Sequence, residues 1–465
     1  MKLPTIVFSH DAEVQHVLPA YITETFSLPV TVVTSADELR RQVNEVPQTL
    51  VFFDIRAEAW HTETEQALTW LESGHMRLGY MVTLTDRWLP FRWATTIDLH
   101  ETASIDFPCS WETVDRLLAP LKDGTKFPSP RMVPQQQVIE SEKIRFSTHT
   151  PSLFPVIDQL RRVAAHDVTL LLIGETGTGK TTLAQLIHGL SPRREAPFLN
   201  VACGAMPSDL IESELFGHVR GAFTSADRNR TGRFEAAGRG TLLLDEIDAL
   251  ALKEQAKLLR VIETGEFEPV GSTDTMISEA RLVVASNLDL ETLASQNKFR
   301  TDLYYRLNVL QFVLPPLRER PLDVVPMATQ FIGECSVRHN IPVSRIHREF
   351  LTALKRYQWP GNIREMKNQL QRSVLFCDRG DLSIDHLSPA IAHALGTSSP
   401  DGNGHSAPPS WSLAEQVAKS ERQILEEALR ANGFKRTATA RFLGITRVGL
   451  YKKMRRHGLL DIDAK

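Results

Sequence analysis

The sequence predicts an α/β multidomain protein that ends in a small all-α domain. Apolar strand-like runs alternate with helical patterns over residues 1–121, which is typical of a parallel sheet with crossover helices. Strand–loop–helix units recur between residues 144 and 316, and helical periodicity dominates from there onward. The chain has 465 residues, enough for about three domains, so each pattern is assigned to its own domain.

The first domain, residues 1–121, contains four apolar runs with helical segments among them. The runs are Thr5–Phe8, Val30–Val33, Leu50–Phe53 and Tyr80–Leu84, and the helical segments are Ala36–Val43 and Glu63–Glu72. Residues 122–143 are polar, with three prolines and three consecutive glutamines, and are predicted to form a linker.

The remaining chain divides into four parts. Residues 144–316 are predicted to form an α/β core and residues 317–394 a helical lid. Residues 395–410 are rich in glycine, serine and proline, the composition of a flexible linker. Residues 411–465 form the small helical domain.

Composition excludes several classes of protein. The chain is 42% hydrophobic and 23% charged, so it can bury enough apolar surface to fold. It has no apolar run of about 20 residues and no signal-peptide core, so we expect a cytoplasmic protein without a membrane partner. Its four cysteines are scattered, which argues against a disulfide framework or a zinc site. The interval from Lys435 to Arg456 carries only basic charges, which predicts an anionic partner there.

A glycine-rich loop follows the apolar run Leu170–Ile173 and precedes a helical pattern. This order is that of a phosphate-binding loop, in which backbone N–H groups cradle phosphates at a helix N-terminus. Lys180 would supply positive charge to the β/γ-phosphates of ATP, and the Thr181 hydroxyl would bind Mg²⁺. The residues expected at the nucleotide are Gly174, Glu175, Thr176, Gly177, Thr178, Gly179, Lys180, Thr181 and Thr182.

A second apolar strand, Thr241–Leu244, ends in two acids. Asp245 is placed to hold Mg²⁺ through water, and Glu246 to orient and deprotonate the attacking water. The alternative is a buried strand that simply ends in acidic residues. Because the phosphate loop is also present, the sequence predicts ATP hydrolysis.

Four further polar residues are candidates for this site. Asn287 ends the apolar run that starts at Leu282, where it would sense the γ-phosphate or water. Arg300 and Arg306 lie six residues apart, and Arg364 begins a later helix. Taken alone, these arginines would be read as solvated surface charges.

From about Ile144 to Pro389 the chain resembles the bacterial enhancer-binding proteins, the NtrC-type AAA+ activators of sigma-54 RNA polymerase. The resemblance rests on the nucleotide motifs together with the strings Glu212–His218, Gly221–Ala226, Gly232–Ala237 and Leu314–Arg320. It implies an AAA+ ATPase core with a helical lid and an active hexameric ring. A dimer at rest would suit paired DNA half-sites one helical turn apart, but the sequence leaves the resting oligomer open. In that ring Arg300 and Arg306 would be arginine fingers on the neighbour's nucleotide, and Asn287 and Arg364 the two sensors.

The same resemblance assigns a contact loop for the sigma factor. Residues Gly221, Ala222, Phe223, Thr224, Ser225 and Ala226 match the family's GAFTGA loop, with Phe223 and Thr224 at the contact. Ser225 stands where the family has glycine, and a serine adopts positive φ only at a steric cost that glycine does not have. A second departure is Ala202, where the family commonly has an asparagine that restrains the catalytic glutamate; Asn200, two residues earlier, is a candidate replacement.

The C-terminal domain has the pattern of a helix-turn-helix. Helical segments Ser420–Ala431 and Thr437–Leu443 are followed by a third that starts at Thr446, with Gly444 in the turn. The third helix would enter the major groove of double-stranded DNA, with Arg447 and Val448 at the bases and basic residues at phosphates. It resembles a Fis-type domain at upstream enhancer-like sites, and its expected DNA-binding residues are Thr446, Arg447, Val448, Tyr451, Lys452 and Arg455.

The N-terminal domain resembles a response-regulator receiver. Asp54 follows the third strand, at the phosphoacceptor position, and Asp11 follows the first. Receivers also need a lysine after the fifth strand, and this chain has none between Lys2 and Lys122. We therefore favour a degenerate receiver that works by protein contact or a small ligand over one that is phosphorylated at Asp54.

The leading functional hypothesis is an ATP-driven transcription activator that binds upstream DNA and remodels the sigma-54 RNA polymerase holoenzyme. One alternative is a DNA-binding regulator of this ancestry that no longer engages sigma-54, in line with Ser225 and Ala202. Another is an AAA+ remodeller of a different protein target, localised by its helix-turn-helix.

Overall fold

The structure is a computed structural model that describes residues 3–46, 48–122, 135–223, 226–377 and 379–395, together with Thr439, Leu450 and Met454. Residues Met1–Ser398 form one compact unit and Ser399–Lys465 a second. Within the described ranges no helix is long and apolar enough to cross a membrane. The three predicted helices of the C-terminal domain lie outside the described residues, apart from Thr439, Leu450 and Met454.

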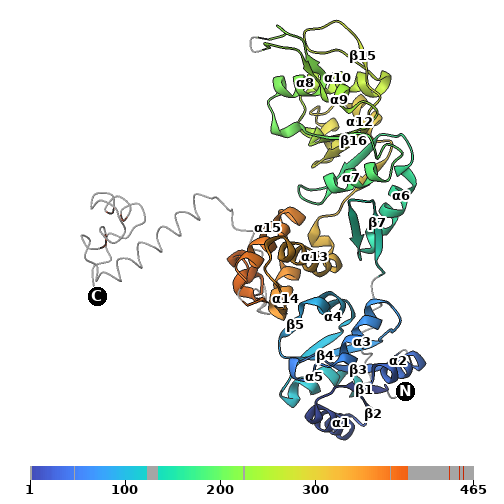
Figure 1. Ribbon diagram of the computed structural model, residues 1–465, viewed down its shortest axis with the longest axis vertical. Coiled ribbons are helices and arrows are strands. Elements are labelled where there is room, and N and C mark those ends of the chain that lie inside the picture. Colours follow the sequence, from blue (N-terminus) through green and yellow to red (C-terminus); the bar gives the residue numbers. More distant parts are fainter. Residues whose placement is uncertain are drawn as a thin grey trace. The chain divides into compact units, whose positions relative to one another are not determined.

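The N-terminal domain is a parallel five-stranded sheet with helices on both faces (Figure 1). The strand order is β2-β1-β3-β4-β6, which is the flavodoxin-like order 2-1-3-4-5 once β5 is set aside. This confirms the predicted parallel α/β domain. The strands are β1 (Thr5–Phe8), β2 (Val30–Val33), β3 (Leu50–Asp54), β4 (Tyr80–Thr85), β5 (Trp88–Pro90) and β6 (Ala103–Asp106). The helices are α1 (Ala12–Phe26), α2 (Ala36–Glu45), η1 (Ala57–Ala59), α3 (Thr62–Glu72), η2 (Phe91–Trp93), α4 (Ala94–His100) and α5 (Trp111–Lys122).

Strand alternation divides the apolar side chains of this sheet between two cores. On one face Val7 and Phe52 pack with α1 and α5. On the other face Phe8 and Phe53 pack with α2, α3 and α4. Because both faces are covered, the carboxyl edge of the sheet is the part that remains for a polar site.

The predicted linker contains structure at its C-terminal end. Within residues 122–143 the chain forms strand β7 (Gln137–Glu140), which pairs antiparallel with β8 (Arg145–Thr148). Ile139 is 3% exposed and packs in the core of the ATPase region. The second domain therefore begins at β7, earlier than the sequence indicated, because one buried isoleucine is hard to recognise beside three glutamines.

The central region is a second parallel sheet, of order β10-β13-β16-β9-β17. Its strands are β9 (Leu170–Ile173), β10 (Phe198–Ala202), β13 (Thr241–Asp245), β16 (Arg281–Ser286) and β17 (Gln311–Val313). Its helices are η3 (Pro151–Leu153), α6 (Phe154–Ala164), α7 (Lys180–Gly189), η4 (Cys203–Ala205), α8 (Ser208–Phe216), α9 (Arg233–Ala237), η5 (Ile247–Ala249), α10 (Leu252–Thr264), α11 (Leu290–Ser295) and α12 (Thr301–Leu307). Two short hairpins project from it: β11 (Gly217–His218) with β12 (Arg230–Thr231), and β14 (Glu266–Phe267) with β15 (Met276–Ile277).

The two faces of the central sheet are covered by different helices. Helices α6 and α7 pack on Leu172, Leu243 and Val283. Helices α8 to α12 pack on Leu171 and Leu244. The carboxyl ends of β9, β13 and β16 are thereby fixed next to one another.

The helical lid follows the central sheet. Its elements are η6 (Leu317–Glu319), α13 (Pro321–His339), β18 (Arg345–His347), α14 (Arg348–Arg356), α15 (Asn362–Leu375), β19 (Asp381–Leu382), η7 (Ile384–His386), α16 (Pro389–Ala392) and η8 (His393–Leu395). Trp359 is fully buried at its centre and donates from Nε1 to the Leu354 carbonyl at 2.8 Å. This places α15 directly after a fixed turn.

Candidate functional site

A cavity of about 220 Å³ lies where the glycine-rich loop, the ends of β13 and β16 and the lid helix α15 meet. The loop joins β9 to α7, which begins at Lys180, so its N–H groups sit at a helix N-terminus. Gly179 has φ 106° and Gly177 φ 82°, conformations that favour glycine. A Cβ at Gly177 would also lie 2.5 Å from the Gly361 carbonyl of the lid. The loop can follow this path only with glycine at these positions.

Lys180 is held over the loop by oxygen atoms. Its Nζ donates to the carbonyls of Gly174 (2.6 Å) and Glu175 (3.1 Å) and to Oδ1 of Asn287 (2.7 Å). Burial lowers the pKa of Lys180, and nearby carboxylates oppose that shift. The ammonium is thus fixed where phosphates would arrive, and Asn287, predicted as a sensor, contacts it directly.

Thr181 and Asp245 form a pair of oxygen ligands at the start of α7. The Thr181 hydroxyl donates to Oδ2 of Asp245 at 3.2 Å. A hydroxyl and a carboxylate suit Mg²⁺, which usually keeps several waters and is completed by substrate phosphates. The residues therefore fit a magnesium ion that is held jointly by the protein and a nucleotide.

Glu246 adopts an unusual backbone conformation that turns its carboxylate toward the cavity. Its φ is 58°, and its N–H donates to Oδ1 of Asp245 at 3.0 Å. Asn287 Nδ2 donates to Glu246 Oε1 at 3.4 Å. A Cβ at Gly204 would lie 2.3 Å from Glu246 Oε2, so Gly204 leaves the space that this carboxylate uses. Strain of this kind is typical of functional residues.

The proposed role of Asn200 is not supported by its position. Asn200 is exposed on β10, opposite Leu243, and no hydrogen bond joins it to Glu246 in the described part of the chain. The amide bonded to Glu246 belongs to Asn287. Asn287 is in turn fixed by Asp248, whose Oδ1 accepts its backbone N–H at 3.1 Å. Asp248 was not identified from the sequence, since a lone acid after a strand carries no distinctive signal.

The lid binds the glycine-rich loop through residues that sequence reasoning did not select. Asn362 Nδ2 donates to the Thr176 carbonyl (3.0 Å) and to Glu175 Oε2 (3.1 Å), and the Ile363 N–H donates to the Gly177 carbonyl at 2.9 Å. Arg318 makes a bidentate pair with Glu175, at 2.6 and 2.9 Å. Hydrogen bonds from Arg318 and Asn362 lower the pKa of the Glu175 carboxyl.

The three predicted arginines occupy different places. Arg364, on α15, lines the cavity. Arg300 and Arg306 are not among the described residues that line it. Their side chains are 39% and 60% exposed and pair with Asp302 (2.6 Å) and Glu263 (2.9 Å). One chain thus brings Arg364 to the cavity but leaves Arg300 and Arg306 outside it.

The predicted contact loop lies between β11 and β12. The Gly221 N–H donates to the Ala226 carbonyl and the Ala226 N–H to the Phe223 carbonyl, both at 2.9 Å, which closes a tight turn. Phe223 is 36% exposed and its ring meets that of His218 edge-on at 4.9 Å. Thr224 and Ser225 lie outside the described residues. The described part of this loop therefore includes one partly exposed aromatic side chain, that of Phe223.

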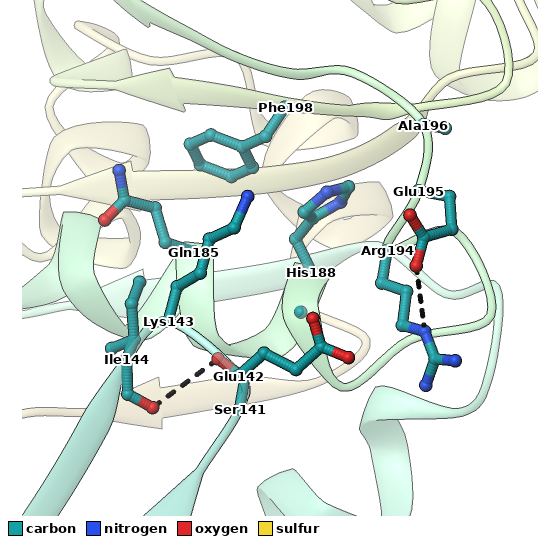
Figure 2. A pocket seen from close by; sticks show the side chains of 11 residues that line it. Ser141, Glu142, Lys143, Ile144, Gln185, His188, Arg194, Glu195, Ala196 and Phe198 are labelled. Carbon is teal, nitrogen blue, oxygen red and sulfur yellow. Dashed lines mark hydrogen bonds and ion pairs between the residues drawn. The ribbon is translucent and has the colours of Figure 1, made fainter.

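A second cavity, of about 420 Å³, lies at the other end of α7 (Figure 2). Gln185 and His188 of α7 face it together with Lys143 and Phe198, and Arg194 is bonded to Glu195 at its edge. It contains no residue of the glycine-rich loop. It is therefore separate from the nucleotide site.

The acidic site of the N-terminal domain is filled by an arginine. Asp54 is 1% exposed and accepts from Ser9 Oγ (2.7 Å), from Arg56 Nε (3.0 Å) and from Arg56 Nη2 (2.8 Å). Arg56 also donates to Asp11 Oδ2 at 2.9 Å, and its guanidinium lies 4.7 Å from the ring centre of Phe107, which follows β6. Burial would lower the pKa of Arg56, but hydrogen bonds to Asp54 and Asp11 outweigh it and raise it.

The expected DNA-binding residues Thr446, Arg447, Val448, Tyr451, Lys452 and Arg455 lie outside the described residues. Their assignment stays a prediction.

Comparison with known proteins identifies three regions of the chain. Residues 146–313 match the sigma-54 interaction domain, residues 318–403 an AAA+ ATPase lid domain, and residues 416–457 the bacterial regulatory proteins of the Fis family. The AAA+ P-loop ATPase core, the lid and the helix-turn-helix predicted from sequence are thus confirmed as domains of this chain.

Named relatives agree with these matches. The chain is 41% identical over 306 residues to the Nif-specific regulatory protein of Azotobacter vinelandii, covering 64% of this chain and 56% of that protein. It is 38% identical over 317 residues to the regulatory protein AtoC of Escherichia coli, covering 68% of each. The crystal structure of NtrX from Brucella abortus has the same fold, with a TM-score of 0.50 at 22% identity over 98% of this chain and 100% of that one. The chain belongs to the sigma-54-dependent, AAA+ family of transcription regulators.

Proposed function

We propose that this protein binds upstream DNA, assembles into a ring and uses ATP hydrolysis to remodel the closed complex of sigma-54 RNA polymerase. The observation that carries the proposal is the composition of the nucleotide site. Thr181, Asp245, Glu246 and Asn287 converge on one cavity, yet Arg300 and Arg306 lie outside it. A neighbouring subunit would complete the site.

The chemistry divides among these residues. Glycine-loop N–H groups and Lys180 would bind the phosphates, and Thr181 and Asp245 would hold Mg²⁺, which neutralises charge on the phosphoryl group. Glu246 would orient and deprotonate water, and its contact with Asn287 would report the γ-phosphate. Arg300 or Arg306 of the next subunit would stabilise the transition state, so hydrolysis would depend on assembly into a hexamer from a resting dimer.

The contact with sigma-54 is assigned to the loop at residues 221–226. Phe223 is a partly exposed apolar side chain of that loop, and Thr224 follows it in the sequence. Gly221 has φ 82°, a conformation that favours glycine at the start of the loop. The helix-turn-helix would keep the ring near the promoter through Arg447 and Val448 at bases and Lys452 and Arg455 at phosphates.

The N-terminal domain would work without phosphorylation of Asp54. Arg56 forms hydrogen bonds with both Asp54 and Asp11, the carboxylates with which a phosphoacceptor site would bind its cation. Incubation with acetyl phosphate tests this point. We expect no modification of Asp54 in the intact protein, and stoichiometric acyl phosphate at Asp54 would overturn this part of the proposal.

The main test is ATP-dependent opening of a sigma-54 closed promoter complex by the purified protein. We expect opening with ATP, none with Glu246→Ala, and hydrolysis without opening for Thr224→Ala. Arg239→Ala, at an exposed ion pair with Glu279, is the matched control and should behave as the unchanged protein. Hydrolysis without any opening by the unchanged protein would favour the second candidate, a regulator that no longer engages sigma-54, which Ser225 in the contact loop supports.

A further inference from the structure

The Asn287 amide lies between Lys180 and Glu246, two charged side chains of the nucleotide cavity. Its Oδ1 accepts from Lys180 Nζ at 2.7 Å, and its Nδ2 donates to Glu246 Oε1 at 3.4 Å. An amide has one accepting end and one donating end, whereas an ammonium can only donate. The amide oxygen must therefore face Lys180, which leaves the amide NH₂ group for the Glu246 carboxylate. The contact with Glu246 thus depends on the contact with Lys180.

Lys180 uses all of its hydrogen-bond donors within the chain. An ammonium carries three N–H donors, and those of Lys180 bond the carbonyls of Gly174 and Glu175 and the Asn287 amide. An arriving phosphate oxygen must therefore replace one of these acceptors. The two carbonyls belong to the loop that binds the phosphates, whereas Asn287 is a side chain that can rotate. We expect phosphate to take the donor bonded to Asn287, which frees the amide to leave Glu246.

Asp248 fixes the backbone of Asn287. It lies two residues after Glu246, in η5, and its Oδ1 accepts the Asn287 N–H at 3.1 Å and the Ser286 hydroxyl at 2.8 Å. Ser286 ends β16 and is fully buried, so water has little access to this contact. The Asp248 carboxylate therefore ties the short helix that follows Glu246 to the strand that precedes Asn287.

The Glu246 end of the contact is held by its own backbone. The Ala249 N–H donates to the Glu246 carbonyl at 3.0 Å, and the intervening Ile247 is fully buried. With both backbones held, only rotation of the two side chains can make or break the bond between Asn287 and Glu246. Ala202, opposite Asp245 on the neighbouring strand, has no side chain that could donate to Glu246. Control of the Glu246 carboxylate therefore falls to Asn287.

We propose that Asp248 is a positioning residue for ATP hydrolysis: by fixing Asn287, it makes the orientation of the Glu246 carboxylate depend on whether Lys180 is bound to phosphate. This role rests on the proposed ATPase function, but not on any contact with sigma-54. Asp248 is not among the described residues that line the cavity, so it acts on the reaction through Asn287 and not by touching the nucleotide.

The first experiment compares ATP turnover of full-length variants that sedimentation shows to form the same assembly. Asp248→Ala should lower kcat by about 10²-fold, the scale of a misplaced reacting group, with affinity for a non-hydrolysable ATP analogue unchanged. Asp248→Asn should recover most of the loss, because its amide oxygen has two lone pairs for the same two bonds. Burial lowers the pKa of Lys180 and the charge of Asp248 opposes that shift. If Asp248 acted by this charge alone, Asp248→Asn would be as slow as Asp248→Ala.

Asp289→Ala is the matched control for loosening of the same loop. Asp289 lies two residues after Asn287, is exposed, and caps α11 by accepting from the N–H groups of Glu291 and Thr292. Its removal weakens the segment after β16 through bonds that do not involve Asn287, so kcat should stay at the level of the unchanged protein. An equal fall of kcat in Asp289→Ala and Asp248→Ala would mean that any loosening here suppresses hydrolysis, and it would overturn the positioning role.

The second experiment is a double-variant cycle of Asp248→Ala with Asn287→Ala. If Asp248 acts through the Asn287 amide, the double variant should turn over ATP no more slowly than Asn287→Ala alone. Losses that multiply, an unchanged kcat in Asp248→Ala, or no recovery in Asp248→Asn would each overturn the proposal while leaving the ATPase function intact. Absence of ATP hydrolysis by the unchanged, assembled protein would instead overturn the proposed function, and this role with it.

Discussion

The nucleotide site and the Asp54 site share one plan. Each lies at the carboxyl edge of a parallel sheet, where strands that end side by side bring polar groups together. In the nucleotide site Lys180 is bonded to carbonyls and to Asn287, which leaves the carboxylates of Asp245 and Glu246 at the cavity. In the N-terminal site Arg56 bonds the carboxylates themselves.

The difference shows that the position of an arginine in the sequence decides whether the carboxylates of such a site remain free to bind a ligand. Arg56 is two residues from Asp54, so it reaches the acids of its own sheet without any other domain. Arg300 and Arg306 are paired with Asp302 and Glu263, outside the cavity of their own chain. One site is closed by a local arginine, and we propose that the other is completed by an arginine from a neighbouring subunit. Each prediction below tests one side of this contrast.

The largest expected effect is loss of the arginine supplied by a neighbour. Arg300→Ala should lower ATP turnover by about 10³–10⁵, the usual contribution of an arginine finger, with nucleotide affinity largely kept. Turnover of the assembled full-length protein is the measurement. Arg239→Ala is the control for loss of an exposed arginine.

A mixing experiment separates this role from a structural one. Arg300→Ala and Glu246→Gln chains are each inactive alone, but together they would form some sites with Glu246 from one chain and Arg300 from the next. Recovery of turnover on mixing is expected. Absence of recovery, with mixed assemblies demonstrated, would place Arg300 in its own chain's site and break the contrast.

Loss of the proposed base comes next. Glu246→Gln should lower turnover by about 10²–10⁴, as expected for removal of a general base, and leave ATP binding intact. Gly204→Ala supplies a companion variant, because its Cβ would lie 2.3 Å from Glu246 Oε2 and displace the carboxylate. Turnover should fall in both variants, and full activity in Glu246→Gln would remove this residue from the chemistry.

Removal of the local arginine tests the closed site. Arg56→Ala leaves Asp54 buried without its partner, which should destabilise the N-terminal domain by about 3–5 kcal/mol. Calorimetry of the full chain should show the transition of that domain at lower temperature. Arg40→Ala, which removes an exposed pair with Asp37 and a cation–π contact with Trp70, should lower the transition by much less. An unchanged transition in Arg56→Ala would mean that Arg56 does not stabilise the site.

The sequence predicted the nucleotide site of this comparison, but it did not predict how the Asp54 site is closed. The glycine-rich loop, Asp245, Glu246 and Asn287 could be found because each ends an apolar run at a known spacing, and the structure brings all of them to one cavity. The sequence also showed that the lysine of receivers is absent, but it did not show that Arg56 binds the acidic residues instead. From sequence alone, an arginine two residues after Asp54 would be taken for an exposed surface residue. In the structure its side chain bonds Asp11 and lies over the ring of Phe107.

The elements that sequence missed depend on tertiary contacts. Strand β5 has three residues, one of them proline, and exists because β18 of the lid provides its hydrogen-bonding partner. Strand β7 is recognisable only through Ile139, which the core buries. Likewise Asn362 forms hydrogen bonds with Glu175 and Thr176, which lie 187 and 186 residues away in the chain. Local patterns carry no information about such pairings.

The smallest expected effect concerns these lid contacts. Asn362 has φ 51°, so Asn362→Gly keeps the backbone conformation and removes the side chain that donates to the phosphate loop and accepts from the Leu317 N–H of the lid. Leaving partners of a buried hydrogen bond unsatisfied costs about 1–3 kcal/mol, so ADP binding measured by titration calorimetry should weaken by at most about 5- to 150-fold. Arg318→Ala breaks a pair with Glu175 that is about 40% exposed on both sides, and it should weaken binding by less. If Arg318→Ala had the larger effect, the lid would hold the loop mainly by charge, as Arg56 holds Asp54, and the two sites would be more alike than their geometry indicates.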